Sequence, residues 1–192
     1  MITETTTLTR ENVKSQTEAE LAIELAEKTR DFDQVLALTS TMTIDRITTL
    51  VRVAYRTGKT IIWDILLNMV LQLVTQKIPN ALNSSKVYCY LPSYLYRMRN
   101  QEPYKQYIEQ YSRKIKQTGE KLHGKFIMNC RPSMWRDIQK LKLKNKVLDN
   151  CCVVYSIWDG YKTQDETTIK FLDTMSELSI PIIDRTRIWT RK

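Results

Sequence analysis

The sequence predicts an α/β fold with three layers, in which a mainly parallel sheet is flanked by helices. Two observations support this prediction. Short apolar runs typical of buried strands alternate along the chain with segments of helical periodicity. Only 4 Gly and 5 Pro occur among the 192 residues, which argues against a turn-rich all-β fold. Because 42% of the residues are hydrophobic, the chain can bury a core, and its length fits a single domain spanning 1–192.

The clearest unit lies between residues 33 and 64. Residues 35–39 form an apolar run that predicts a buried strand, and residues 60–63 predict a second one. A helix is expected between them, because Gly58 stands where helices usually end and apolar residues recur at helical spacing. The recurring residues are Ile44, Ile47, Leu50, Val51, Ala54 and Tyr55. Strand, helix and strand predict a βαβ unit with parallel strands.

The flanking segments continue the alternation. Residues 1–16 lack a clear period and predict an irregular arm, and residues 17–30 predict a helix with acidic residues in its first turn. Residues 65–76 predict another helix, with Leu66, Met69, Val70 and Leu73 facing inward. Further strands are predicted at 87–90, 126–129, 151–156 and 180–183, and further helices at 132–141 and 167–178.

An aromatic stripe marks one more predicted helix, which ends at Gly119. Its members are Tyr104, Tyr107, Ile108, Tyr111 and Ile115. Two interpretations apply to this stripe. It is either the face that packs on the domain or a platform on which nucleic acid bases stack.

The cysteines and the single histidine bear on redox state and on metals. Cys89, Cys130, Cys151 and Cys152 show no Cys-x-x-Cys spacing, and most lie in or beside apolar runs. They are interpreted as small buried residues in a reducing compartment, with a metal site as the alternative. His123 has no clustered ligand partners, so no metal site is predicted in this chain.

Localisation follows from what the sequence lacks. No run of eighteen apolar residues occurs, so no membrane span is predicted. The first residues lack a basic flank followed by an apolar core, which is the pattern of a signal peptide. A cytoplasmic protein is the expectation.

Positive charge is concentrated in the middle segment. Residues 86–146 contain 15 Lys and Arg against 4 Asp and Glu, a balance of +11, whereas the rest of the chain has a balance of −2. This segment is a candidate surface for RNA or another polyanion, with Lys140, Lys142, Lys144 and Lys146 as candidate contacts. The alternative is a solvated face without a partner.

Ligands of open parallel sheets bind beyond the carboxyl ends of the strands. Three loops are predicted there, and all three carry hydroxyl groups. The candidate phosphate-binding residues are Ser40, Thr41 and Thr43 in the first loop, Arg131 and Ser133 in the second, and Ser156 and Trp158 in the third. Arg131 adds a guanidinium fork that suits phosphate. Ordinary helix caps and turns are the alternative.

Four segments in order resemble the β-CASP domain of metallo-β-lactamase-fold hydrolases of the ribonuclease J kind. They are Glu4 to Arg10, the stretch T-S-T-M-T-I-D-R from Thr39, C-R-P-S-M from Cys130, and Y-S-I-W-D-G-Y from Tyr155. In the second segment Ile44, Arg46, Ala54, Gly58 and Lys59 fit the family pattern, whereas Thr43 replaces its usual Asn. The resemblance implies a Rossmann-like domain whose loops line a cleft, and it adds Arg46 to the candidate phosphate contacts.

The same resemblance implies zinc-dependent hydrolysis, but the residues that hold zinc in the family are missing. No His-x-His-x-Asp-His cluster occurs, and no His-x-Ser-Gly-His follows Ile183. Glu4 occupies the family's acidic position and is the one candidate catalytic residue. We therefore expect a β-CASP-like domain that is inactive alone, binds RNA or a phosphorylated ligand, and has a metallo-β-lactamase domain or host protein as a partner.

Two rival interpretations remain at this point. The first is a stand-alone polyanion-binding or protein-interaction module with no link to catalysis. The second is a nucleotide-handling enzyme on a doubly wound sheet, which the missing Gly-rich phosphate loop argues against.

Overall fold

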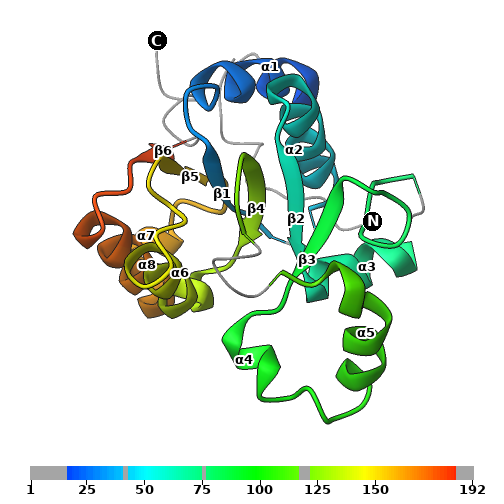
Figure 1. Ribbon diagram of the computed structural model, residues 1–192. Coiled ribbons are helices and arrows are strands. Elements are labelled where there is room, and N and C mark those ends of the chain that lie inside the picture. Colours follow the sequence, from blue (N-terminus) through cyan, green and yellow to red (C-terminus); the bar gives the residue numbers. More distant parts are fainter. Residues whose placement is uncertain (1–16, 41–42, 75–76, 117–121, 185–192) are drawn as a thin grey trace, which may run out of the picture.

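Six parallel strands form the centre of the computed structural model, which describes residues 17–40, 43–74, 77–116 and 122–184 (Figure 1). The predicted α/β fold is confirmed. The strands are β1 Gln34–Leu38, β2 Thr60–Asp64, β3 Val87–Tyr90, β4 Phe126–Cys130, β5 Cys151–Tyr155 and β6 Ile182–Asp184. Their order in the sheet is β3-β2-β4-β1-β5-β6, and every neighbouring pair is parallel.

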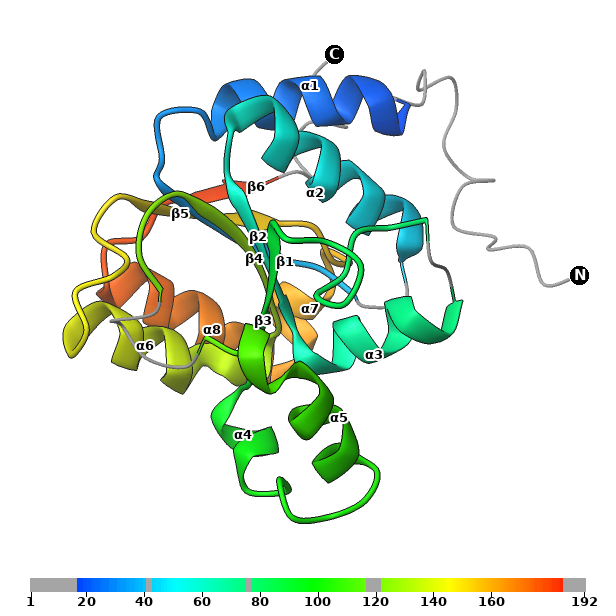
Figure 2. The ribbon, with the colours of Figure 1, turned by 45° about the vertical axis from the view of Figure 1, so that its right-hand side comes forward.

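Helices cover both faces of the sheet. Figure 2 shows α1 (Glu18–Lys28) and α2 (Ile44–Thr57) on one side, and α6 (Trp135–Leu143) and α8 (Glu166–Glu177) on the other. Successive strand residues alternate between the two core clusters, as the pleat requires. Ala37 packs in the cluster with α1, α2 and α3 (Ile65–Val74), and Leu38 packs in the cluster with α6 and α8. Central strands β1, β4 and β5 are buried along their whole length.

The chain reverses its direction of winding between β1 and β4. These two strands are neighbours, with Leu38 opposite Cys130. The chain leaves β1 through α2 and joins β2, and it leaves β4 through α6 and joins β5. Because α2 and α6 cover opposite faces, the carboxyl ends of β1 and β4 flank a topological switch point (Figure 2).

Local signals in the sequence explain where the first two helices begin and end. Thr17 caps α1 and forms a capping box with Glu20, in which each side chain bonds the other residue's backbone N–H. Gly58 is the C-cap of helix α2, and its φ of 65° lies in the left-handed region. Its backbone N–H donates to the Ala54 carbonyl. Both helices were predicted, and their ends agree with these signals.

The predicted inward face of α3 is only partly correct, because Leu66 and Met69 pack against the core as predicted but Leu73 does not. Leu73 is 75% exposed, and the buried positions are Ile65, Leu67, Asn68 and Leu71. The helix follows β2 with no loop between them, and the Asp64 carboxylate accepts the Leu67 N–H at 2.7 Å. Since Asp64 is fixed inside the core, it sets the rotation of the helix and turns Leu73 outward.

The aromatic stripe packs against the core, as the first interpretation expected. Tyr111 is fully buried, and Tyr104 and Tyr107 pack against the same cluster as α3. Helix α5 (Tyr104–Tyr111) is shorter than predicted, because a 3-10 turn follows it and Ile115 then forms a parallel bridge with Cys89. The predicted end at Gly119 lies outside the described residues.

Two short helices were not predicted. They are α4 (Ser93–Tyr96), which follows β3, and α7 (Tyr161–Gln164), which precedes α8. The four cysteines are free and buried. Within the described ranges, no helix is long and apolar enough to cross a membrane.

Candidate functional site

A pocket of ≈490 Å³ lies at the switch point. Its lining comes from the segments that follow three neighbouring strands and from the start of α8, namely Thr39, Ser40, Arg131, Pro132, Ser133, Ile157, Tyr161, Asp165, Thr167 and Thr168. The size suits a small organic ligand, and the position is the one that ligands of open parallel sheets take. We call this cavity the switch-point pocket.

Two hydroxyl groups at the strand ends are buried without a partner. Thr39 is only 4% exposed, and neither its Oγ1 nor the Oγ of Ser156 has a hydrogen-bond partner among the described residues. Ser156 donates its N–H to the Leu38 carbonyl at 2.9 Å, so it extends the pairing of β5 with β1 and stands beside Thr39. Buried polar groups nearly always have partners, and exceptions require an explanation such as a ligand or ion.

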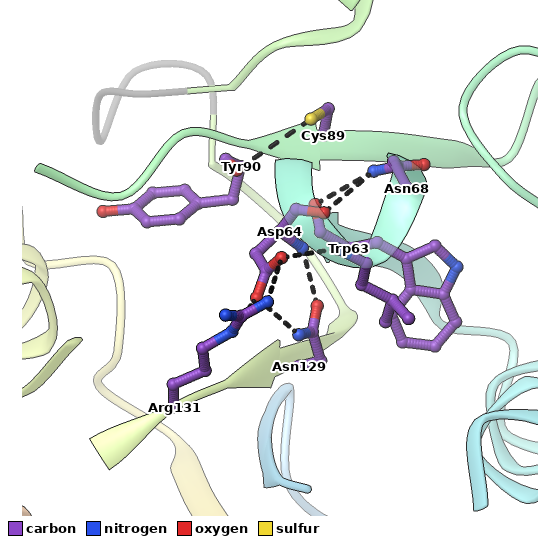
Figure 3. Close-up of polar contacts among 8 residues, drawn as sticks. Trp63, Asp64, Asn68, Cys89, Tyr90, Asn129 and Arg131 are labelled. Atoms are coloured by element: carbon purple, nitrogen blue, oxygen red, sulfur yellow. Dashed lines mark hydrogen bonds and ion pairs between the residues drawn. The ribbon is translucent and has the colours of Figure 1, made fainter. Parts of the chain in front are cut away.

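A buried ion pair holds the arginine that lines this pocket (Figure 3). Asp64 is fully buried at the end of β2, and Arg131 donates to both of its oxygens, from Nε at 2.8 Å and from Nη2 at 3.1 Å. The Arg131 side chain is 22% exposed. Its remaining nitrogen, Nη1, has no partner in the described part of the chain, so one edge of the guanidinium is available for a ligand.

Asn129 completes this cluster from β4. Its amide donates to Asp64 Oδ2 at 3.0 Å, and its Oδ1 accepts the Asp64 backbone N–H at 2.6 Å. With the Leu67 N–H on Oδ1, the carboxylate accepts four hydrogen bonds. A buried charge needs hydrogen bonds of this kind to offset the loss of water. Removing one partner of a buried ion pair costs about 3–5 kcal/mol of stability. Asp64 therefore acts as the positioning residue for Arg131.

The start of α8 adds a hydrogen-bond acceptor to the pocket lining. Asp165 caps α8, taking the Thr168 N–H at 2.8 Å and the Thr168 hydroxyl at 2.5 Å. A carboxylate at this position disfavours an anion there and favours ligand hydroxyl or amine groups. The pocket thus offers a guanidinium edge and hydroxyls from the strand-end loops and a carboxylate from the start of α8.

An aromatic pair stands at the pocket entrance. Tyr161 lines the pocket and meets Trp158 edge to face, with ring centroids 5.3 Å apart, and Trp158 is 57% exposed. The Trp158 ring passes so close to Gly160 that a Cβ there would lie 2.3 Å from it. Burial raises the pKa of Tyr155 to about 12, and its hydroxyl donates to the Trp158 carbonyl at 3.0 Å. Tyr155 therefore shapes this loop as a neutral phenol.

The structure brings several predicted site residues together. Ser40, Arg131 and Ser133 line the switch-point pocket, and Ser156 and Trp158 lie in the adjoining segment after β5. Thr43 precedes α2 but makes no side-chain cap. Thr41 and Glu4 lie outside the described residues.

Arg46 lies elsewhere. Its Nη2 donates to Glu18 Oε1 on α1 at 3.0 Å, and it does not line the pocket. Burial lowers the pKa of Arg46, and Glu18 opposes that effect. Its contact with α1 ties the two helices together.

Three of the four lysines predicted to contact a polyanion are exposed, and one is partly buried. Lys140 and Lys144 are exposed on and just after α6, and Lys146 is exposed in the turn beyond. Lys142 is partly buried and donates to the Leu148 carbonyl at 2.6 Å, with Asp149 at 3.7 Å. It therefore stabilises the turn after α6.

Several polar residues of the site were not among the predicted candidates, including Thr39, Asp64, Asn129 and Asp165. Each is a polar residue that ends an apolar run or opens a helix. The position of Asp64 directly after a buried strand, at the same edge as Arg131, is the signal that could have identified it.

Comparisons with known proteins do not assign the chain to a family. No family model matches the chain, and no curated protein sequence matches it. The fold and the geometry above are therefore the basis for inferring a function.

Proposed function

We propose that this chain is a β-CASP-like domain that binds a phosphorylated ligand in the switch-point pocket. One observation carries the proposal. The buried hydroxyl of Thr39, which lines the pocket together with Arg131, lacks a partner among the described residues, as does the hydroxyl of the neighbouring Ser156, and a buried carboxylate holds Arg131 in place. Hydroxyls and a guanidinium edge are the donors that a phosphate group needs.

The charge of the site limits the kind of ligand. Arg131 is paired with Asp64, and Asp165 also lines the pocket, so the pocket has no net positive charge and binding depends on directed hydrogen bonds. Asp165 at the start of α8 suits a ligand hydroxyl. A phosphate ester that also carries hydroxyl groups, such as a nucleotide or a sugar phosphate, fits both kinds of group.

Zinc chemistry, which the resembling family uses, does not fit the residues of this chain. His123 is the only histidine and is exposed, and the described residues contain no group of three His, Cys, Asp or Glu side chains able to hold a metal. The pocket donors are mainly hydroxyls, which are not the usual zinc ligands. We therefore propose a binding role in this chain, with any hydrolysis dependent on a metallo-β-lactamase domain or host protein.

Calorimetric titration tests the proposal. We expect adenosine 5′-monophosphate and ribose 5-phosphate to bind saturably, and adenosine to bind far more weakly. Ser133→Ala should weaken binding about tenfold if its hydroxyl bonds the phosphate. Ser85→Ala, at another exposed serine, serves as the control and should bind as wild type does. Equal binding of adenosine and its monophosphate, or no saturable binding of any of these compounds, would refute the proposal.

A further inference from the structure

A second cavity, separate from the switch-point pocket, lies between α4 and α6. It measures ≈400 Å³ and shares no lining residue with the switch-point pocket. Its walls include Tyr96 and Arg97 at the end of α4, and Lys140 and Asn145 on and after α6. We call it the α4–α6 groove.

The groove is flanked by positive charge without acidic partners. Arg136, Lys140 and Lys144 are spaced by four residues, so they lie along one side of α6, and Arg97 faces them from α4. All four are exposed, and none forms an ion pair with a described residue. Three charges over eight residues of helix extend for about 12 Å, a line that suits successive phosphates.

One acid, Asp137, lies in the groove, and its hydrogen bonds are directed inward. It is 5% exposed and accepts the Ser93 N–H at 3.2 Å, together with the Ser93 hydroxyl. The Tyr90 hydroxyl also bonds it, and burial together with this carboxylate raises the pKa of Tyr90. Asp137 therefore joins α4 to α6 and builds the groove, and its one charge is outnumbered by the four cations.

An exposed aromatic ring stands at the edge of the groove. Tyr96 is 45% exposed, and the Arg99 guanidinium lies 4.3 Å from its ring centroid. A tyrosine ring next to a line of cations is the arrangement by which proteins bind single-stranded nucleic acids, with bases stacked on the ring and phosphates on the cations. An acidic peptide would use the cations but would have no bases to stack.

We propose that the α4–α6 groove binds single-stranded nucleic acid, with Tyr96 as the stacking residue and Arg97, Lys140 and Lys144 as phosphate contacts. This inference does not depend on the proposed function of the switch-point pocket. It narrows the basic segment 86–146 to one surface, and it leaves out Lys142, which bonds the Leu148 carbonyl.

Fluorescence anisotropy with labelled oligouridylate tests the groove. We compare wild type with the triple variant R97Q/K140Q/K144Q and with the control K86Q/K105Q/R113Q, which removes the same charge at other exposed positions of the segment. The groove variant should bind at least tenfold more weakly, and its log–log salt slope should be smaller by about 2, since a single strand gives about 0.7 per phosphate. The control should stay within about twofold of wild type.

Tyr96→Leu separates a nucleic acid site from a general anionic surface. It should weaken oligouridylate binding about fivefold or more through lost stacking, and it should leave the binding of heparin unchanged. Circular dichroism verifies that each variant is folded. Loss of affinity shared equally by the two triple variants, equal effects of Tyr96→Leu on heparin and RNA, or no RNA binding at low salt would each overturn the proposal. None of these results depends on binding of nucleotides in the switch-point pocket.

Discussion

Thr39→Val should stabilise the protein and weaken binding of its phosphorylated ligand. Threonine and valine are both β-branched and similar in shape, so the substitution mainly removes Oγ1 from the end of β1. That oxygen is buried and lacks a described partner, and such a group costs about 1–3 kcal/mol. If the substitution removes a cost at the lower end of this range, the free energy of unfolding should rise by about 1 kcal/mol and the melting temperature by about 2–4 °C.

The effect on binding should have the opposite sign. A hydrogen bond to a charged group contributes about 1.5–3 kcal/mol, so its loss should weaken the binding of adenosine 5′-monophosphate about tenfold or more. Urea unfolding and calorimetric titration measure the two quantities on the same preparations. Thr174→Val is the matched control, because Thr174 is also 4% exposed but bonds the Lys170 carbonyl at 2.7 Å within α8.

The control should lose stability and keep its affinity, since it removes a hydrogen bond that is already made. Thr39→Val and Thr174→Val are therefore expected to change stability in opposite directions, and only Thr39→Val should weaken binding. A Thr39→Val protein that is less stable than wild type and binds the nucleotide equally well would refute the reasoning, because Oγ1 would then serve the fold and not a ligand.

Two further predictions concern buried charges. Asp64→Ala should lower the free energy of unfolding by about 3–5 kcal/mol in urea titrations, because it leaves Arg131 without its carboxylate, and Asp64→Leu combined with Arg131→Met should recover most of that loss; equal losses in the single and double variants would contradict this. Burial lowers the pKa of Lys59 below its ordinary 10.5, so the unfolded chain holds the proton more readily and stability should rise with pH between the lowered pKa and 10.5. Lys59→Met should abolish that rise, and an unchanged pH profile of the unfolding free energy would exclude Lys59 as its source.

Much of the fold could be predicted because its signals are local. The strand ends, the capping box at Thr17 and the left-handed Gly58 each depend on a few neighbouring residues. The order of the strands is not encoded in this way. Strands β1 and β2 read as one βαβ unit, but β4 lies between them, because hydrophobic runs of similar composition do not specify which strand is the neighbour.

The site was predictable only in part for a related reason. The loops after β1 and β4 were expected at the same edge, and Ser40, Arg131 and Ser133 do line one pocket. The Asp64–Arg131 pair joins residues 67 positions apart, so no local pattern indicates it. Asp64 also fixes the rotation of α3 by accepting the Leu67 N–H, which explains why Leu73 was wrongly predicted to face inward.

Neighbouring strand ends at this edge differ in how their polar groups are satisfied, and this difference separates stability from binding. At β2 and β4, the Asp64 carboxylate accepts four hydrogen bonds, so that end is closed and rigid. At β1 and β5, the hydroxyls of Thr39 and Ser156 have no described partner. Unsatisfied buried hydroxyls cost stability, whereas the satisfied ion pair does not carry that cost. Arg131 connects the two ends, because its Nε and Nη2 bond Asp64 while its side chain lines the pocket. The satisfied end thus holds Arg131, a charged donor of the pocket lining, near the Thr39 hydroxyl that a ligand would satisfy.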